Sequence, residues 1–81
     1  MNVKLKIGLR IKELRDKANM SQKDLAYSSD LDRSYIASVE SGKRNISIVN
    51  IEKISIALGV SLSGFFKNER FDNDTTSSRK L

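Results

Sequence analysis

The sequence contains no cysteine, histidine, proline or tryptophan. Without cysteine there is no disulfide, and without cysteine and histidine the usual zinc ligands are missing. The four glycines form no phosphate-binding loop, and the carboxylates are scattered along the chain. These absences exclude disulfide-stapled and zinc-finger proteins. They also predict a protein that is not an enzyme and that needs no metal and no cofactor.

Long apolar runs are missing too. No stretch approaches the roughly 20 residues of a membrane span, and Met1 to Ile7 alternates charged with apolar residues, unlike a signal peptide. The absence of cysteine fits a cytoplasmic location. A chain of 81 residues fits one domain with a thin core, so we expect self-association to add stability.

Charge is unevenly distributed. Lys and Arg total 15 against 10 Asp and Glu, which gives a net charge of +5. The last ten residues, Asp72 to Leu81, are neutral, so the basic surplus lies before them. This balance suits a polyanionic partner. We expect a folded domain over residues 1–70 and a polar, disordered tail over residues 71–81.

Apolar spacing predicts a first helix from about Val3 to Ala18. Ile7, Ile11 and Leu14 recur at helical spacing and lie on one face. Asn19 suits the left-handed residue beyond the helix end.

Capping signals predict two further short helices. Ser21 and Asp24 form a capping-box pattern that opens the second helix, which ends near Ser28. Asp32 suits the N-cap of a third helix, which ends at Ser41 and is followed by Gly42.

The last two predicted helices begin at Ser47, with Gly59 as a stop, and at Ser61. Their apolar residues are Ile51, Ile54 and Leu58, then Leu62, Phe65 and Phe66. The chain is thus predicted to be all-α, with five short helices and no strand.

The stretch from Ser21 to Ser41 has the features of a helix-turn-helix. Ala26 is small enough for the point where the helices approach, and Asp30 tolerates a positive φ in the turn. Apolar residues in this stretch can lock the pair onto the rest of the domain. They are Leu25, Leu31, Ile36 and Val39.

The outer side of the third helix predicts a DNA reader. Its N-terminal turns are the part that such motifs insert into the major groove. Arg33 carries a planar fork that matches the acceptors of guanine, Ser34 and Ser38 are short, and Ala37 suits a thymine methyl group. The alternative for each of these residues is a plain solvated helix surface.

Groups that suit DNA phosphates flank this helix. They are Gln22, Tyr35, Lys43, Arg44 and Asn45. Gln22 lies at a helix N-terminus, which favours anions, and the last three form a basic loop. The alternatives are a capping-box surface for Gln22, a lid on the core for Tyr35 and a solvated turn for the loop.

Adjacent phenylalanines predict a dimer surface. Phe65 and Phe66 point about 100° apart on a helix, so one small domain has difficulty burying both. The predicted dimer residues are Ile46, Ile48, Val49, Leu62, Phe65 and Phe66. The alternative is ordinary core packing.

Several runs resemble the Cro and lambda-repressor family, also called XRE-type, over about Ile7 to Phe66. They are Ser21–Ala26, Ile36 with Glu40–Arg44, and Leu58–Ser61. Within that family, the run Leu31–Ile36 is similar to the controller proteins of restriction–modification systems. The turn departs from the family pattern, because Ser29 and Asp30 replace an apolar residue and a glycine.

The resemblance implies a lambda-repressor-like fold with the helix-turn-helix at helices 2 and 3. It also implies an ion pair between Arg15 and Glu40. As a function it implies a homodimeric transcription regulator that binds a pseudo-palindromic operator on double-stranded DNA. The alternatives are a phage-type repressor, an antitoxin-like regulator with a protein partner, or a pure protein-interaction module. Asp24 and the second helix offer a surface for RNA polymerase as a further partner, with the sign of regulation open.

Overall fold

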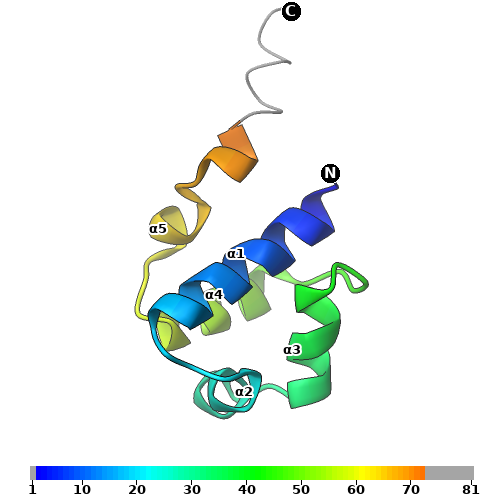
Figure 1. Ribbon diagram of the computed structural model, residues 1–81, viewed down its shortest axis with the longest axis vertical. Coiled ribbons are helices and arrows are strands. Elements are labelled where there is room, and N and C mark those ends of the chain that lie inside the picture. The colour runs from blue at the N-terminus through cyan, green and yellow to red at the C-terminus, as the bar shows by residue number, and fades with distance from the viewer. Residues whose placement is uncertain (1, 73–81) are drawn as a thin grey trace, which may run out of the picture.

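The computed structural model describes residues 2–72 as a bundle of short helices (Figure 1). The helices are α1 (Val3–Lys17), α2 (Gln22–Ser29), α3 (Arg33–Glu40), α4 (Ile48–Ala57) and α5 (Leu62–Phe66). A further helical turn occupies residues 69–72. The prediction of an all-α fold is confirmed, and the five predicted helices are all present, while the helical turn at residues 69–72 was not predicted.

Serine side chains begin three of the helices. The hydroxyls of Ser21, Ser47 and Ser61 accept from the backbone N–H three residues on, at 3.0, 3.1 and 3.0 Å. The carboxylate of Asp24 accepts from the N–H of Ser21 at 2.9 Å, so the predicted capping box is complete. Asp32 lies at the N-cap of α3, but its side chain makes no capping hydrogen bond.

Left-handed residues separate the helices where the sequence predicts them. Asn19 and Asp30 have φ values of 56° and 58°, and Gly42 and Gly59 have φ values of 77° and 78°. Asparagine, aspartate and glycine adopt this conformation most readily, and it turns the chain sharply after each of the first four helices. The short connections therefore follow from local residue preferences.

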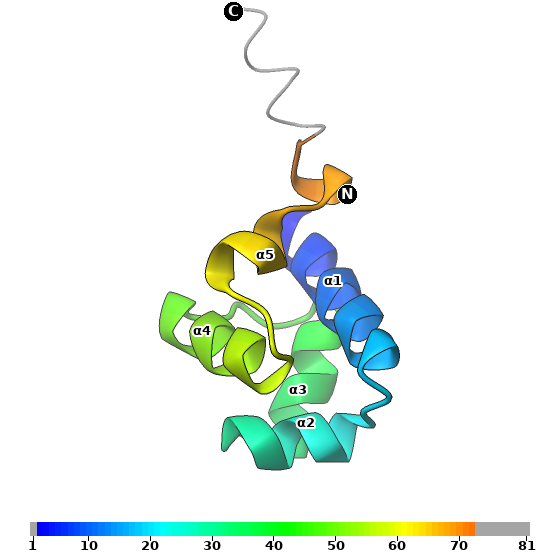
Figure 2. The same cartoon turned by 90° about the vertical axis from the view of Figure 1, so that its left-hand side faces the viewer.

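One hydrophobic core contains side chains from all five helices. In Figure 2, α1 lies on one side of the bundle and α4 on the other, with α2 and α3 below. The fully buried side chains of the core include Ile11, Leu25, Ile36, Ile54 and Phe65. Each such side chain contributes about 1.5–3 kcal/mol through burial. No helix within residues 2–72 has the length and apolarity that a bilayer crossing requires.

Gly8 marks the closest approach of α1 to α3. A Cβ atom built there would lie 2.5 Å from the carbonyl oxygens of both Val39 and Glu40. Only glycine leaves room for this crossing, which presses the end of α3 against α1.

Arg10 attaches α5 to α1. Its Nε donates to the carbonyl oxygen of Phe65 at 2.7 Å, and its Nη2 donates to that of Gly64 at 2.9 Å. Its Nη1 pairs with Glu13 at 2.8 Å. These bonds use one N–H group of each guanidinium nitrogen, in an arginine that is only 7% exposed.

The aromatic residues at the C-terminal end pack in a cluster. Phe65 is fully buried in the core, and this burial removes it from the predicted dimer surface. Phe66 is half-buried, and its ring lies 5.0 Å from that of Phe65 and 5.1 Å from that of Phe71. The packed chain thus includes Phe71, at the start of the predicted tail, whose residues 73–81 lie outside the described part.

Candidate nucleic-acid interface

The pair α2–α3 is locked onto the core from one side. Leu25, Ile36 and Val39 are at most 1% exposed, and Ala26 is 6% exposed where the two helices meet. Ser29, which was predicted to lie in the turn, is the last residue of α2. It is buried, and its hydroxyl donates to the carbonyl oxygen of Leu25 at 2.7 Å. That bond satisfies the hydroxyl, which explains how this position accepts serine.

The opposite side of α3 faces solvent. Arg33 and Ser34 are exposed, and Ala37 and Ser38 are half-exposed. Among residues 2–72, Arg33 makes no ion pair and no side-chain hydrogen bond. The structure therefore brings the four predicted base-reading residues to one outer surface, with an unpaired guanidinium at its N-terminal end.

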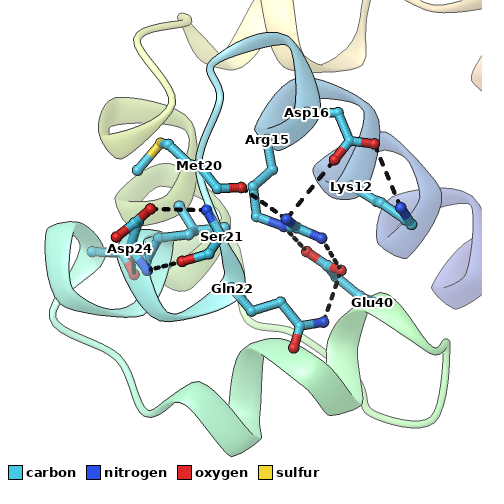
Figure 3. Close-up of polar contacts among 10 residues, drawn as sticks. Lys12, Arg15, Asp16, Met20, Ser21, Gln22, Asp24 and Glu40 are labelled. Carbon is cyan, nitrogen blue, oxygen red and sulfur yellow. Dashed lines mark hydrogen bonds and ion pairs between the residues drawn. The ribbon is translucent and has the colours of Figure 1, made fainter.

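A polar network holds the junction of α1, α2 and α3 (Figure 3). Arg15 donates from Nε to Oε2 of Glu40 at 2.8 Å and from Nη2 to Oε1 at 3.1 Å. Its Nη1 also donates to the carbonyl oxygen of Met20 at 2.8 Å. The hydrogen bonds to Glu40 raise the pKa of Arg15 above its usual value, so the guanidinium stays charged.

Gln22 joins this network from the first position of α2. Its Nε2 donates to Oε1 of Glu40 at 3.1 Å (Figure 3). The end of the outer helix is thereby connected to the beginning of α2. The capping box occupies the backbone N–H groups of Ser21 and Asp24. Within residues 2–72, the second Nε2 proton and the backbone N–H groups of Gln22 and Lys23 remain available to an anion.

The basic loop lies on the other side of α3. Lys43, Arg44 and Asn45 are exposed. The guanidinium carbon of Arg44 lies 5.1 Å from the ring centroid of Tyr35, which is cation–π distance. Nδ2 of Asn50 donates to the Tyr35 hydroxyl at 3.0 Å.

Tyr35 and Arg44 line an open depression of about 660 Å³ beside α3. Its wall includes Ser34, Tyr35, Ser38 and Arg44, together with residues from the end of α2 and the turn. Two predicted base readers and two predicted phosphate contacts therefore share one hollow.

A separate apolar surface lies on α4. Ile48, Val49 and Ile56 are 62%, 61% and 70% exposed. Of the other residues predicted for a dimer surface, Ile46, Leu62 and Phe66 are half-buried. The sequence analysis missed Ile56, although it follows Val49 by two helical turns and therefore shares its face.

Sequence reasoning also missed the roles of Arg10 and Asn50. The spacing of Arg10 and Glu13 was a signal for their ion pair, but nothing local pointed to the carbonyl oxygens on α5. Asn50 lies 15 residues from Tyr35, and its bond depends on how α4 packs.

Comparison with known proteins places this geometry in a family. Residues 11–65 match the helix-turn-helix family model HTH_3. The control protein C.MunI from Mycoplasma sp is 47% identical over 68 residues, which cover 83% of this chain and 92% of that protein.

Solved structures of restriction–modification controller proteins have a similar fold. The restriction–modification controller protein C.AhdI from Aeromonas hydrophila matches with a TM-score of 0.75 and 46% identity, covering 78% of this chain and 96% of that one. A C.Esp1396I controller protein, solved as a tetramer in complex with its natural 35-base-pair operator, matches with a TM-score of 0.76 and 41% identity. That match covers 83% of this chain and 90% of the other. The chain therefore belongs to the XRE-type helix-turn-helix family, and within it the chain is similar to the control proteins of restriction–modification systems.

Proposed function

We propose that the chain is a sequence-specific, DNA-binding transcriptional regulator and the control protein of a restriction–modification system. The observation that carries the proposal is the outer face of α3, where Arg33 is exposed and has no ion-pair partner within residues 2–72, while the opposite face is packed into the core. The similar C.Esp1396I protein was solved on its operator. A regulator of this kind acts in the cytoplasm and catalyses no reaction.

The N-terminal half of α3 enters the major groove in this proposal. Arg33 donates two hydrogen bonds to O6 and N7 of a guanine. Ser34 and Ser38 approach neighbouring base edges, and Ala37 contacts a thymine methyl group. Base contacts of this kind supply sequence preference, because each base pair presents a distinct pattern there.

Phosphate contacts on both sides of α3 set its position in the groove. Gln22 and the α2 N-terminus grip the backbone on one side. Tyr35, Lys43, Arg44 and Asn45 grip it on the other. Such contacts provide affinity that falls with salt, and they carry no sequence preference of their own.

The active species is a homodimer on a pseudo-palindromic operator. The exposed Ile48, Val49 and Ile56 on α4 supply an apolar surface that association would bury, with Ile46, Leu62 and Phe66 beside it. Two copies would place their α3 helices in successive major grooves, about 34–36 Å apart.

Sedimentation tests the dimer. The wild-type chain is expected to sediment as a dimer at micromolar concentration, and Val49→Asp as a monomer, because the substitution places a charge in an apolar contact. Lys67→Asp, at an exposed position beyond α5, is the control that keeps the dimer. A wild-type chain that stays monomeric in a concentrated sample contradicts the proposal.

Contact with RNA polymerase remains a prediction for activation. Asp24 and the outer face of α2 are exposed beside the DNA-reading helix. They would lie on the protein surface next to bound DNA.

Selection from a random pool of duplexes tests DNA recognition itself. The purified chain is expected to enrich one pseudo-palindromic sequence, and that sequence is expected to occur upstream of its own gene. Failure to enrich any sequence at moderate salt would overturn the proposed function.

A further inference from the structure

Asn50 connects α4 to the outer surface of α3. It is the third residue of α4, and its backbone N–H donates to the Ser47 hydroxyl at 3.1 Å. Its side-chain Nδ2 donates to the Tyr35 hydroxyl at 3.0 Å. Asn50 is half-buried, so its backbone is fixed by the helix cap and its side chain by this contact.

The direction of this hydrogen bond determines what Tyr35 can do. A tyrosine hydroxyl has one proton to donate and lone pairs to accept with. Because the lone pair facing Asn50 already accepts, the hydroxyl proton must point elsewhere. No acceptor for this proton is found within residues 2–72. The proton is therefore available to a group outside the protein.

Arg44 places a positive charge next to Tyr35. Its guanidinium stacks on the Tyr35 ring at 5.1 Å, and both residues line the depression beside α3. A hydroxyl donor and a guanidinium side by side match an acceptor that is anionic and has more than one oxygen. A DNA phosphate has these properties and offers only acceptors.

We propose that Asn50 is a positioning residue for a phosphate clamp made of Tyr35 and Arg44. Asn50 does not touch DNA. It holds the Tyr35 hydroxyl so that this group donates to the backbone phosphate. The proposal rests on the proposed function, and it adds a residue on α4, next to the exposed Ile48 and Val49, to the machinery of DNA binding.

A double-mutant cycle tests the clamp. The probe is the duplex that the wild-type chain enriches from a random pool, and its affinity is measured by fluorescence anisotropy at one fixed salt concentration. Tyr35→Phe is expected to weaken binding about tenfold, because it loses a bond to a charged group. Asn50→Ala is expected to weaken it about three- to tenfold, because the hydroxyl is no longer oriented.

The double variant separates positioning from a general structural role. If Asn50 acts through the hydroxyl, Tyr35→Phe combined with Asn50→Ala binds no more weakly than Tyr35→Phe alone. Losses that multiply would show that Asn50 acts independently of Tyr35, and they would overturn the proposal.

The isosteric variant Asn50→Asp tests the direction of the bond. A carboxylate accepts from the hydroxyl and draws its proton away from the phosphate. It also adds a negative charge, which weakens DNA binding in any background. The loss caused by Asn50→Asp is therefore expected to be larger with Tyr35 than with Tyr35→Phe. Equal losses in the two backgrounds would overturn the proposal.

Two controls keep the outcome interpretable. Thermal unfolding is measured for each variant, and if Asn50→Ala does not fold, Asn50→Asp completes the cycle. A wild-type chain that enriches no duplex overturns the proposed function. A wild-type chain that binds its duplex while Tyr35→Phe loses nothing overturns the clamp alone.

Discussion

The arginines of α1 and those around α3 have opposite surroundings. Arg10 and Arg15 are 7% and 9% exposed, and both are engaged by carboxylate and carbonyl oxygens. Arg33 and Arg44 are exposed, and neither forms an ion pair within residues 2–72. The net charge of +5 counts all four equally.

The difference follows from the cost of burying charge. A buried cation must be paired and hydrogen-bonded, so the α1 arginines are committed to holding helices together. An exposed arginine keeps its hydration and can exchange water for phosphate or guanine. These four arginines thus divide into a structural pair on α1 and an exposed pair on and beside α3.

The largest expected effect comes from breaking the buried pair. Glu40→Ala leaves the Arg15 guanidinium without its carboxylate and also removes the partner of Gln22. We expect a loss of about 3–5 kcal/mol in the free energy of unfolding. Urea denaturation measures it.

The control is an exposed ion pair on α1, the helix that carries Arg15. Lys12 and Asp16 lie 3.4 Å apart with side chains 56% and 61% exposed. Lys12→Ala should cost at most about 0.5 kcal/mol. Equal losses for the two variants would contradict the structural role of the buried pair between Arg15 and Glu40.

Removing the free guanidinium should affect recognition and leave stability unchanged. Arg33→Ala is expected to weaken operator binding by about 1–3 kcal/mol and to relax the preference at one base pair per half-site. Arg33→Lys keeps the charge but loses the planar fork, so it should keep the salt dependence and lose the base preference. An unchanged preferred sequence in both variants would remove Arg33 from the reading set.

A smaller loss of DNA affinity is expected from a substitution in the basic loop. Lys43→Ala should weaken binding to all sequences alike, and it should reduce the slope of log affinity against log salt by about 0.9 for each phosphate that is no longer neutralised. Lys67→Ala removes the same charge at the C-cap of α5, a helix that lies away from α3 (Figure 1), and should leave the slope unchanged. Identical slopes for wild type and Lys43→Ala would exclude a phosphate contact by Lys43.

The smallest expected effect is a change in stability at acidic pH that depends on Glu13. Hydrogen bonds from Arg10 and Arg70 lower the pKa of Glu13 from its usual value of 4.5. A lowered folded-state pKa gives stability that is present above the usual value and is lost as the pH falls through the lowered one.

The role of Glu13 is tested by the difference in free energy of unfolding between the wild type and Glu13→Gln, which we call the gap. This gap should be constant near pH 7 and should shrink as the pH falls below about 4.5, since protonation removes the difference. Thermal unfolding across this range measures it. A gap that does not change with pH would contradict the role of Glu13.

Helix boundaries were predictable because they depend on neighbouring residues. The capping box of Ser21 and Asp24 and the positive φ of Asp30 were predicted from residue types a few positions apart, and the structure has both. The outward placement of Arg33 followed from the inward placement of Ile36 and Val39 on the same short helix.

Contacts between distant segments were not predictable in this way. The bonds from Arg10 to the α5 carbonyl oxygens, and from Asn50 to Tyr35, depend on how helices pack. Adjacent Phe65 and Phe66 carry the same local signal, yet only Phe65 reaches the core. Local pattern identifies a face of a helix, and packing decides which residues on it are fully enclosed.

Protection of guanine N7 from dimethyl sulfate tests the central claim most directly, because N7 lies in the major groove where α3 is proposed to bind. On the selected duplex, the wild-type chain should protect one guanine in each half-site, and Arg33→Ala, at a saturating concentration, should leave that guanine open to methylation. A wild-type chain that protects no guanine, or a protected guanine that stays protected with Arg33→Ala, would contradict the account.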